Sequence, residues 1–167
     1  SMLSFKIILC FLAFVLLQGC GFRPVYSDNS QNNILDFSKI TINPIPDRGG
    51  QILWNHLMLG IDPKRNSIKP IYGLDLTLTE STSSLAVRKS AFATRANLTI
   101  QAKFNLKRLQ DKKTLYSDKY SITVSYNILN SEFATLAAKK DALNNGLFTV
   151  NQGIRTQLAI YFSQIQN

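Results

Sequence analysis

The chain has 167 residues, of which 45% are hydrophobic and 17% are charged. This balance suits a single globular domain with a hydrophobic core, and it excludes a disordered tail, a collagen-like fibre and a large multidomain enzyme. Nineteen Lys and Arg residues against ten Asp and Glu residues give a formal net charge of +9, which favours an anionic partner. Both cysteines, Cys10 and Cys20, lie near the start, so the remaining chain has no disulfide framework.

The first 19 residues have the pattern of an export signal. Ser1 precedes Met2 and is typical of a cloning remnant. Lys6 supplies a positive charge, and residues 7–17 form an unbroken apolar run. This run is shorter than the roughly 20 residues that a membrane-spanning helix needs, but it has the length of a signal-peptide core. The pattern therefore predicts a signal peptide over residues 1–19.

The end of this run resembles a bacterial lipobox. Residues 17–20 read Leu-Gln-Gly-Cys, with an apolar residue three places before the cysteine and a small residue directly before it. In that motif the thiol accepts a diacylglycerol before cleavage, so we expect Cys20 to be lipidated and to become the first mature residue. Two or three acyl chains anchor a protein durably to a membrane. Gly21, in place of the Asp that marks inner-membrane lipoproteins, indicates the periplasmic face of the outer membrane, with residues 20–33 as a tether.

The folded domain is predicted over residues 34–167 and begins with a strand and a helix. Residues 39–43 alternate in polarity and stop at prolines, which predicts a short strand. Asp47 is a candidate N-cap, and the apolar residues of the segment 51–59 follow a helical spacing.

Three more strands are predicted before a long helix. Residues 74–79 predict a half-buried strand with room to extend to Val87. Residues 97–107 alternate most clearly, and residues 120–126 resume the pattern after a hairpin turn at residues 111–113. Such alternation marks an antiparallel sheet with one covered face and one open face.

The last segment has a helical period of 3.6 residues, with Ser131 as a candidate N-cap. Its apolar stripe comprises Phe133, Leu136, Ala137, Leu143, Leu147, Val150, Ile154, Leu158, Phe162 and Ile165. Gly146 and Gly153 are expected to weaken this helix by about 1 kcal/mol each and to permit a kink. The elements together predict an α+β fold: a mostly antiparallel four-stranded sheet with two helices packed on one face, in the order β-α-β-β-β-α.

The residue inventory argues against an enzyme. His56 is the only histidine, no cysteine follows Cys20, and Glu80 and Glu132 are the only glutamates. Nucleophilic, zinc and iron–sulfur sites therefore lack their usual residues, and no phosphate-binding loop or dinucleotide-binding motif occurs. We predict no catalytic residue, metal or cofactor, and we expect His56 to pack at the edge of the core.

Basic residues are concentrated between Arg88 and Lys119, where nine Lys or Arg residues are opposed by only two Asp residues. A solvated face is one interpretation of this charge, and an anion-binding surface is another. Nucleic acid is disfavoured, because an exported, acylated protein rarely meets it and no aromatic stacking pair interrupts the charges. Membrane lipids carry the abundant phosphate of that compartment. Arg88, Lys89 and Arg95, beside a predicted hairpin, are the candidate contacts.

Four segments of the mature chain carry a family resemblance. They are Cys-Gly-Phe-Arg-Pro-Val-Tyr at residues 20–26, Ala-Thr-Arg-Ala-Asn-Leu at residues 93–98, and the helical segments 131–138 and 154–162. In this order they resemble the mature start, the third strand and the C-terminal helix of LptE, the lipopolysaccharide-assembly lipoprotein family, in its alphaproteobacterial form. The resemblance covers nearly all of the mature chain.

The resemblance implies a small α+β plug inside the lumen of the outer-membrane β-barrel LptD. It implies that the protein assists barrel assembly and contacts lipopolysaccharide on its way to the cell surface. Arg88, Lys89 and Arg95 are then expected to bind lipopolysaccharide phosphates through charge-assisted hydrogen bonds. Two alternatives remain: a structural outer-membrane lipoprotein without a barrel partner, and a periplasmic lipid carrier, which needs an enclosed apolar cavity.

Overall fold

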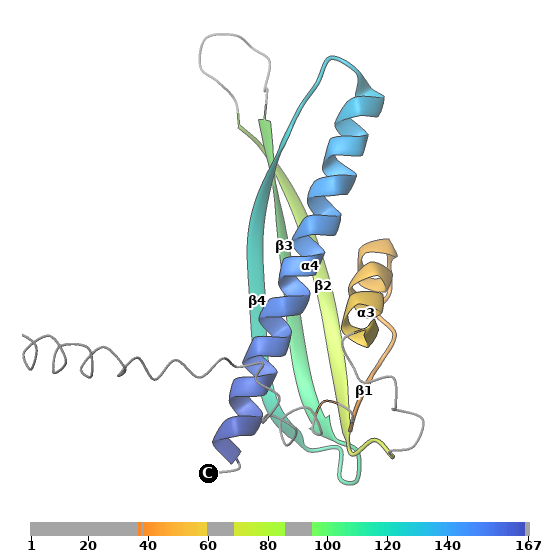
Figure 1. Cartoon of the computed structure of the whole chain (residues 1–167), viewed down its shortest axis with the longest axis vertical. Coiled ribbons are helices and arrows are strands. Elements are labelled where there is room, and N and C mark those ends of the chain that lie inside the picture. Colours follow the sequence, from red (N-terminus) through yellow and green to blue (C-terminus); the bar gives the residue numbers. More distant parts are fainter. Residues whose placement is uncertain (1–36, 38, 60–68, 86–94, 166–167) are drawn as a thin grey trace, which may run out of the picture. The chain divides into compact units, whose positions relative to one another are not determined.

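The computed structural model describes residues 37, 39–59, 69–85 and 95–165, all within one compact unit that spans residues 32–167. Its elements are β1 (Ile40–Ile42), α3 (Arg48–Leu59), β2 (Tyr72–Leu85), β3 (Arg95–Arg108), β4 (Thr114–Asn127) and α4 (Glu132–Ile165) (Figure 1). The predicted α+β class and the β-α-β-β-β-α order are confirmed. The predicted signal peptide, the lipidated Cys20 and the tether lie outside the described residues.

The four strands form one sheet in the order β1-β2-β3-β4. The short β1 runs parallel to the start of β2, whereas β2, β3 and β4 are antiparallel neighbours over their full length. At one end of the sheet Tyr72 pairs with Arg108, and at the other end Arg95 pairs with both Leu85 and Asn127. The sheet is thus mostly antiparallel, as predicted.

The alternation of β3 decides which face of the sheet is covered. Its even-numbered side chains from Ala96 to Leu106 are all buried, and both helices lie on that side (Figure 1). Its odd-numbered side chains form the opposite face and are polar: Arg95, Asn97, Thr99, Gln101, Lys103, Asn105 and Lys107. Burial of the apolar face under the helices provides the main stabilisation of the domain.

Helix α3 begins earlier than the apolar spacing predicts. Asp47 precedes it with a φ of 69°, and its backbone carbonyl accepts a hydrogen bond from the amide of Gln51 at 3.0 Å. Gly49 and Gly50 lie in the first turn: a Cβ at Gly50 would meet the side chain and backbone of Ile45, and one at Gly49 would meet the movable end of the Glu80 side chain. The glycines therefore let the helix start against β2 despite their low helix propensity.

Helix α4 runs without interruption through Gly146 and Gly153. A Cβ atom at Gly146 would overlap the side chain of Ile100 in β3, and one at Gly153 would overlap the ring of Tyr120 in β4. These two glycines allow the helix backbone to lie close to the sheet. The middle of the predicted stripe is buried, at Leu147, Val150, Ile154, Leu158 and Phe162.

Both ends of the predicted stripe are exposed instead of buried. Phe133 is 83% exposed, Leu136 is 65% exposed and Ile165 is 61% exposed. The apolar period of α4 therefore continues past the part of the helix that packs on the sheet. In the described ranges, neither helix has the length and apolar character needed to cross a bilayer.

Candidate functional site

Of the predicted site residues, Arg95 lies within the described chain. It is the first residue of β3, it is exposed, and the strand alternation places it on the open face of the sheet. Cys20, Arg88 and Lys89 lie outside the described residues. The structure therefore fixes Arg95 at the end of the sheet where β3 begins and β4 ends, which we call the Arg95 end.

Two residues of the basic segment between Arg88 and Lys119 form ion pairs with nearby Asp side chains at the end of the sheet opposite Arg95. Lys107 contacts Asp75 at 2.7 Å, and Arg108 contacts Asp111 at 3.1 Å. Hydrogen bonds from Lys107 and from Asn43 lower the pKa of Asp75 below its ordinary value. These two cations are thus partly neutralised.

The open face is polar and largely uncharged. Its side chains form cross-strand hydrogen bonds, between Thr99 and Thr123 at 3.0 Å, Asn105 and Ser117 at 2.6 Å, and Asn97 and Ser125 at 2.7 Å. Lys103 and Lys119 stand directly opposite each other in the β3–β4 register, and both are exposed. Like charges opposite each other destabilise a sheet, so this pair is suited to water or to an anionic partner.

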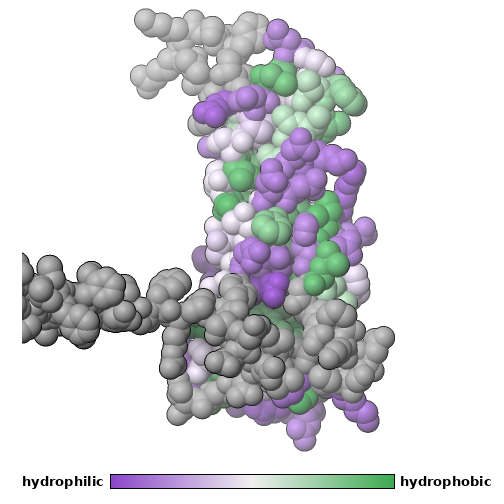
Figure 2. All heavy atoms as spheres, viewed as in Figure 1, coloured by the Kyte–Doolittle hydropathy of each residue, from purple (hydrophilic) through white to green (hydrophobic). Residues whose placement is uncertain are grey.

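Exposed apolar side chains gather beside the Arg95 end. Leu129 is 49% exposed, and it is followed by the exposed Phe133 and Leu136 in the first turns of α4. The hydroxyl of Thr135 accepts from the amide of Leu129 and donates to its carbonyl, which fixes Leu129 against the helix. Figure 2 shows apolar spheres among polar ones at the upper end of this face. One end of the sheet thus has both a cation and exposed apolar groups, which suits an amphiphilic anion, and sequence reasoning missed the apolar part.

A second polar cluster fastens α4 to β4. Asp118 accepts hydrogen bonds from the Tyr116 hydroxyl at 2.7 Å and from Gln157 at 3.0 Å, while the ring of Tyr116 stacks on Tyr161. The bond from Tyr116 and one from the amide of Lys119 hold the pKa of Asp118 below its ordinary value. Burial, aided by the Asp118 carboxylate, raises the pKa of Tyr116 to about 12. This cluster has a structural role.

Metal ligands do not gather within the described part of the chain, where no group of three or more His, Cys, Asp or Glu side chains is found. His56 packs edge-on against Phe148 of α4, with ring centroids 6.0 Å apart, which agrees with its predicted place at the edge of the core.

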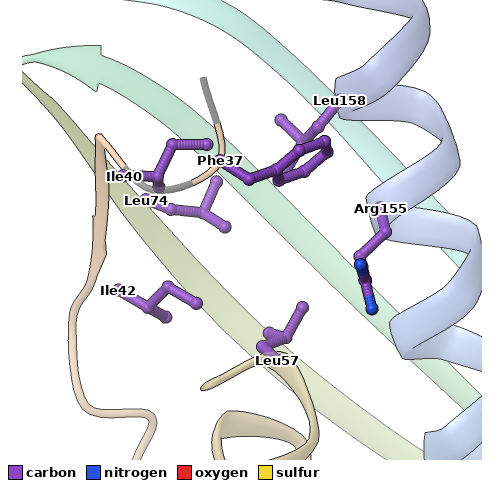
Figure 3. Close-up of a pocket in the computed structure, with 7 residues that line it drawn as sticks. All are labelled: Phe37, Ile40, Ile42, Leu57, Leu74, Arg155 and Leu158. Carbon is purple, nitrogen blue, oxygen red and sulfur yellow. The ribbon is translucent and has the colours of Figure 1, made fainter. Parts of the chain in front are cut away.

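An apolar cavity lies between β1, β2 and the two helices (Figure 3). Six apolar residues and Arg155 line it, and the guanidinium of Arg155 lies 6.0 Å from the ring centre of Phe37. The cavity volume is about 10 Å³, which is room for about one water molecule. An acyl chain does not fit in this space.

No protein-family model matches the chain. An uncharacterized protein of Rickettsia prowazekii (strain Madrid E) is 26% identical over 158 residues, which are 95% of this chain and 96% of that protein. The chain is similar in fold to a candidate lipoprotein from Caulobacter crescentus CB15, with a TM-score of 0.63, 18% identity, and coverage of 80% of this chain and 96% of the other.

Two further solved structures of bacterial lipoproteins have a similar fold. For rare lipoprotein B from Shewanella oneidensis the TM-score is 0.58 at 12% identity, over 77% of this chain and 98% of that one. For a minor lipoprotein from Acinetobacter baumannii the TM-score is 0.56 at 15% identity, over 74% of this chain and 94% of that one. The domain therefore has a fold that solved bacterial lipoproteins share.

Proposed function

We propose that this protein is a lipid-anchored outer-membrane plug that occupies the lumen of an LptD-like β-barrel, assists its assembly and contacts lipopolysaccharide in transit. In this role it binds and positions other molecules, catalyses no reaction and needs no cofactor. One combination carries the proposal: the LptE-like segment at residues 20–26 precedes a fold shared with 98% of the length of rare lipoprotein B.

The open face supports a place inside a barrel. The lumen of an outer-membrane barrel is polar, and an uncovered sheet of Ser, Thr, Asn and Gln side chains can exchange hydrogen bonds with such a wall. The cross-strand bonds of Thr99 and Asn97 hold these groups in fixed positions. A rigid polar surface binds with a smaller loss of conformational entropy than a mobile one.

The Arg95 end supports contact with lipopolysaccharide. This glycolipid carries phosphates beside acyl chains, and the Arg95 end has a guanidinium on the open face of the sheet together with exposed Leu129, Phe133 and Leu136, which lead into α4. An Arg side chain can bind a phosphate through two parallel hydrogen bonds. We expect Arg88 and Lys89 to add to this charge.

The barrel partnership is tested by purifying the native acylated protein in mild detergent and identifying co-purified proteins by mass. We expect a large LptD-like barrel, and we expect Cys20→Ser to remove the protein from the outer-membrane fraction. Recovery of the acylated protein without any barrel partner would contradict the plug and favour a structural lipoprotein.

The glycolipid contact is tested by replacing Arg88, Lys89 and Arg95 with Ser. We expect weaker lipopolysaccharide binding at matched salt, with an almost unchanged melting temperature because Arg95 is exposed. A matched triple variant, Arg48→Ser, Lys139→Ser and Lys140→Ser, removes the same charge from the two helices. Equal losses in both variants would show a general charge effect, and unchanged binding would remove the three residues from the proposal.

The lipid-carrier alternative receives no support from the cavity in Figure 3, because its volume of about 10 Å³ is far below that of an acyl chain. The structural-lipoprotein alternative differs from the plug only in its partner, and the co-purification decides between them.

A further inference from the structure

The end of the sheet opposite Arg95 also exposes aliphatic side chains. Ile71 is 45% exposed and Leu109 is 44% exposed, and the amide of Leu109 donates to the carbonyl of Ile71 at 2.9 Å. Leu109 also rests against Gly73, where an added Cβ would approach it to 3.0 Å. Two neighbouring strand ends therefore present a fixed pair of aliphatic side chains to the outside.

Three lysines lie close to this pair along the chain. Lys69, Lys112 and Lys113 are exposed, and none of them forms an ion pair with another described residue. Lys112 lies at the tip of the β3–β4 hairpin, where a positive φ of 55° closes the turn. We call the surface formed by Lys69, Ile71, Leu109, Lys112 and Lys113 the hairpin end.

The nearby carboxylates do not balance this charge. Asp75 and Asp111 each have a basic partner of their own, Lys107 and Arg108. Six Lys and Arg residues, with Lys39 among them, against two Asp residues leave four positive charges in excess among the described residues of this end. The surface is therefore cationic around an aliphatic centre, which is the composition of surfaces that bind anionic membranes.

The polypeptide also enters the sheet here. The carbonyl of Lys39 accepts hydrogen bonds from the amides of Ile71 at 2.8 Å and Tyr72 at 3.1 Å. Residues 21–36 separate Cys20 from Phe37, and even fully extended they span at most about 60 Å. The Arg95 end is one strand length away, about 45 Å for a strand of 14 residues. A lipid anchor at Cys20 thus tethers the hairpin end more closely than the Arg95 end.

We propose that the hairpin end rests on an anionic phospholipid surface, with Ile71 and Leu109 at the boundary of headgroups and acyl chains and the three lysines on the phosphates. This inference rests on the lipid anchor of the proposed function. It adds a second membrane contact, which orients the domain. Electrostatic attraction of this kind weakens as salt increases, because it acts within a Debye length of the surface.

The test uses the full-length mature protein, purified in its acylated form and reconstituted into phosphatidylcholine vesicles with or without phosphatidylglycerol. A polarity-sensitive fluorophore is placed at Leu109→Cys or, as a matched control, at Phe148→Cys, which has a similar exposure in the middle of α4. Because acylation blocks Cys20 and Cys10 leaves with the signal peptide, the introduced cysteine is the only free thiol.

We expect a blue-shifted emission and quenching by nitroxide lipids at Leu109→Cys, only with phosphatidylglycerol, and neither effect at Phe148→Cys. Lys112→Gln with Lys113→Gln should abolish the quenching, whereas the control pair Lys139→Gln with Lys140→Gln, which removes the same charge from α4, should leave it unchanged. Equal signals at the two labelled positions, or equal effects of the two lysine pairs, would overturn the proposal.

The intact mass of the protein reports whether Cys20 is acylated, so failure of this inference can be distinguished from failure of the proposed function. If Cys20 is acylated and the label at Leu109→Cys stays in water, the hairpin contact is wrong and the anchor stands. If Cys20 carries no acyl chain, the anchor is wrong, and the two lysine pairs are compared by flotation of the unlabelled protein with phosphatidylglycerol vesicles. Selective loss for Lys112→Gln with Lys113→Gln would then support the surface, and equal flotation would overturn it.

Discussion

Gly146 is the position where the packing of α4 on the sheet is best tested. A Cβ atom there would overlap the terminal methyl of Ile100, which is fully buried, and would lie 3.3 Å from a methyl of Val124. In an exposed helix, Gly→Ala stabilises by about 1 kcal/mol, because glycine loses more backbone entropy on folding. At Gly146 we expect the opposite sign, because the methyl has no free space.

The size of the effect follows from two opposing contributions. An extra methyl in a well-packed core costs about 1–3 kcal/mol, and the burial of Ile100 favours the upper part of this range. After subtraction of about 1 kcal/mol for helix propensity, Gly146→Ala should lower the free energy of unfolding by about 1–2 kcal/mol. For a domain of this size the melting temperature should fall by about 3–6 °C.

Ile100→Val supplies the compensating change, because it deletes the methyl that the alanine would overlap. Alone it should cost about 1 kcal/mol, but the double variant should unfold within about 0.5 kcal/mol of the wild type, which is a coupling of about 2 kcal/mol. Urea denaturation of residues 32–167, which form one compact unit, measures all four proteins. Additive effects, or a stabilising Gly146→Ala, would refute the close contact between α4 and β3.

Folding stability should decrease as the pH falls below about 4, because the pKa of Asp118 is lower in the folded than in the unfolded chain, and Asp118→Asn should flatten this decrease in urea titrations. Burial and the Asp118 carboxylate raise the pKa of Tyr116 to about 12, so an absorbance titration should show a tyrosine that ionises well above the ordinary midpoint near pH 10 and is lost in Tyr116→Phe. Leu147→Ala should cost about 2–5 kcal/mol, whereas Leu136→Ala, at a site 65% exposed, should change the free energy of unfolding by less than about 0.5 kcal/mol. Equal costs for the two leucines would contradict the burial pattern of α4.

Periodicity predicted those parts of the fold in which one face of an element is buried throughout. The alternation of β3 identified its covered face, because each even-numbered side chain meets the helices. The same reasoning left the end of β2 open between Thr79 and Val87, because residues 80–85, Glu-Ser-Thr-Ser-Ser-Leu, have no apolar alternation, yet they pair fully with β3. Backbone pairing with β3 determines the structure of residues 80–85. The residue pattern of β2 alone does not contain that information.

The glycines show a second limit of sequence reasoning. Propensity treats Gly49, Gly146 and Gly153 as weak points, but their value lies in what faces them: Glu80, Ile100 and Tyr120, which are distant in sequence. The same holds for the candidate site. The position of Arg95 at a strand start followed from local pattern, whereas the ion pair of Lys107 with Asp75 depends on the β2–β3 register.

The two ends of the sheet suggest an orientation for the proposed plug. The hairpin end carries the excess lysines and is where the chain enters the sheet, while the Arg95 end has a guanidinium and exposed apolar groups about one strand length, or 45 Å, away. This length is close to the thickness of a bilayer with its headgroups, about 40–45 Å. If the protein is the proposed lipid-anchored plug with its hairpin end at the periplasmic leaflet, its Arg95 end would lie at the level of the outer leaflet, where a glycolipid leaving the barrel would meet it.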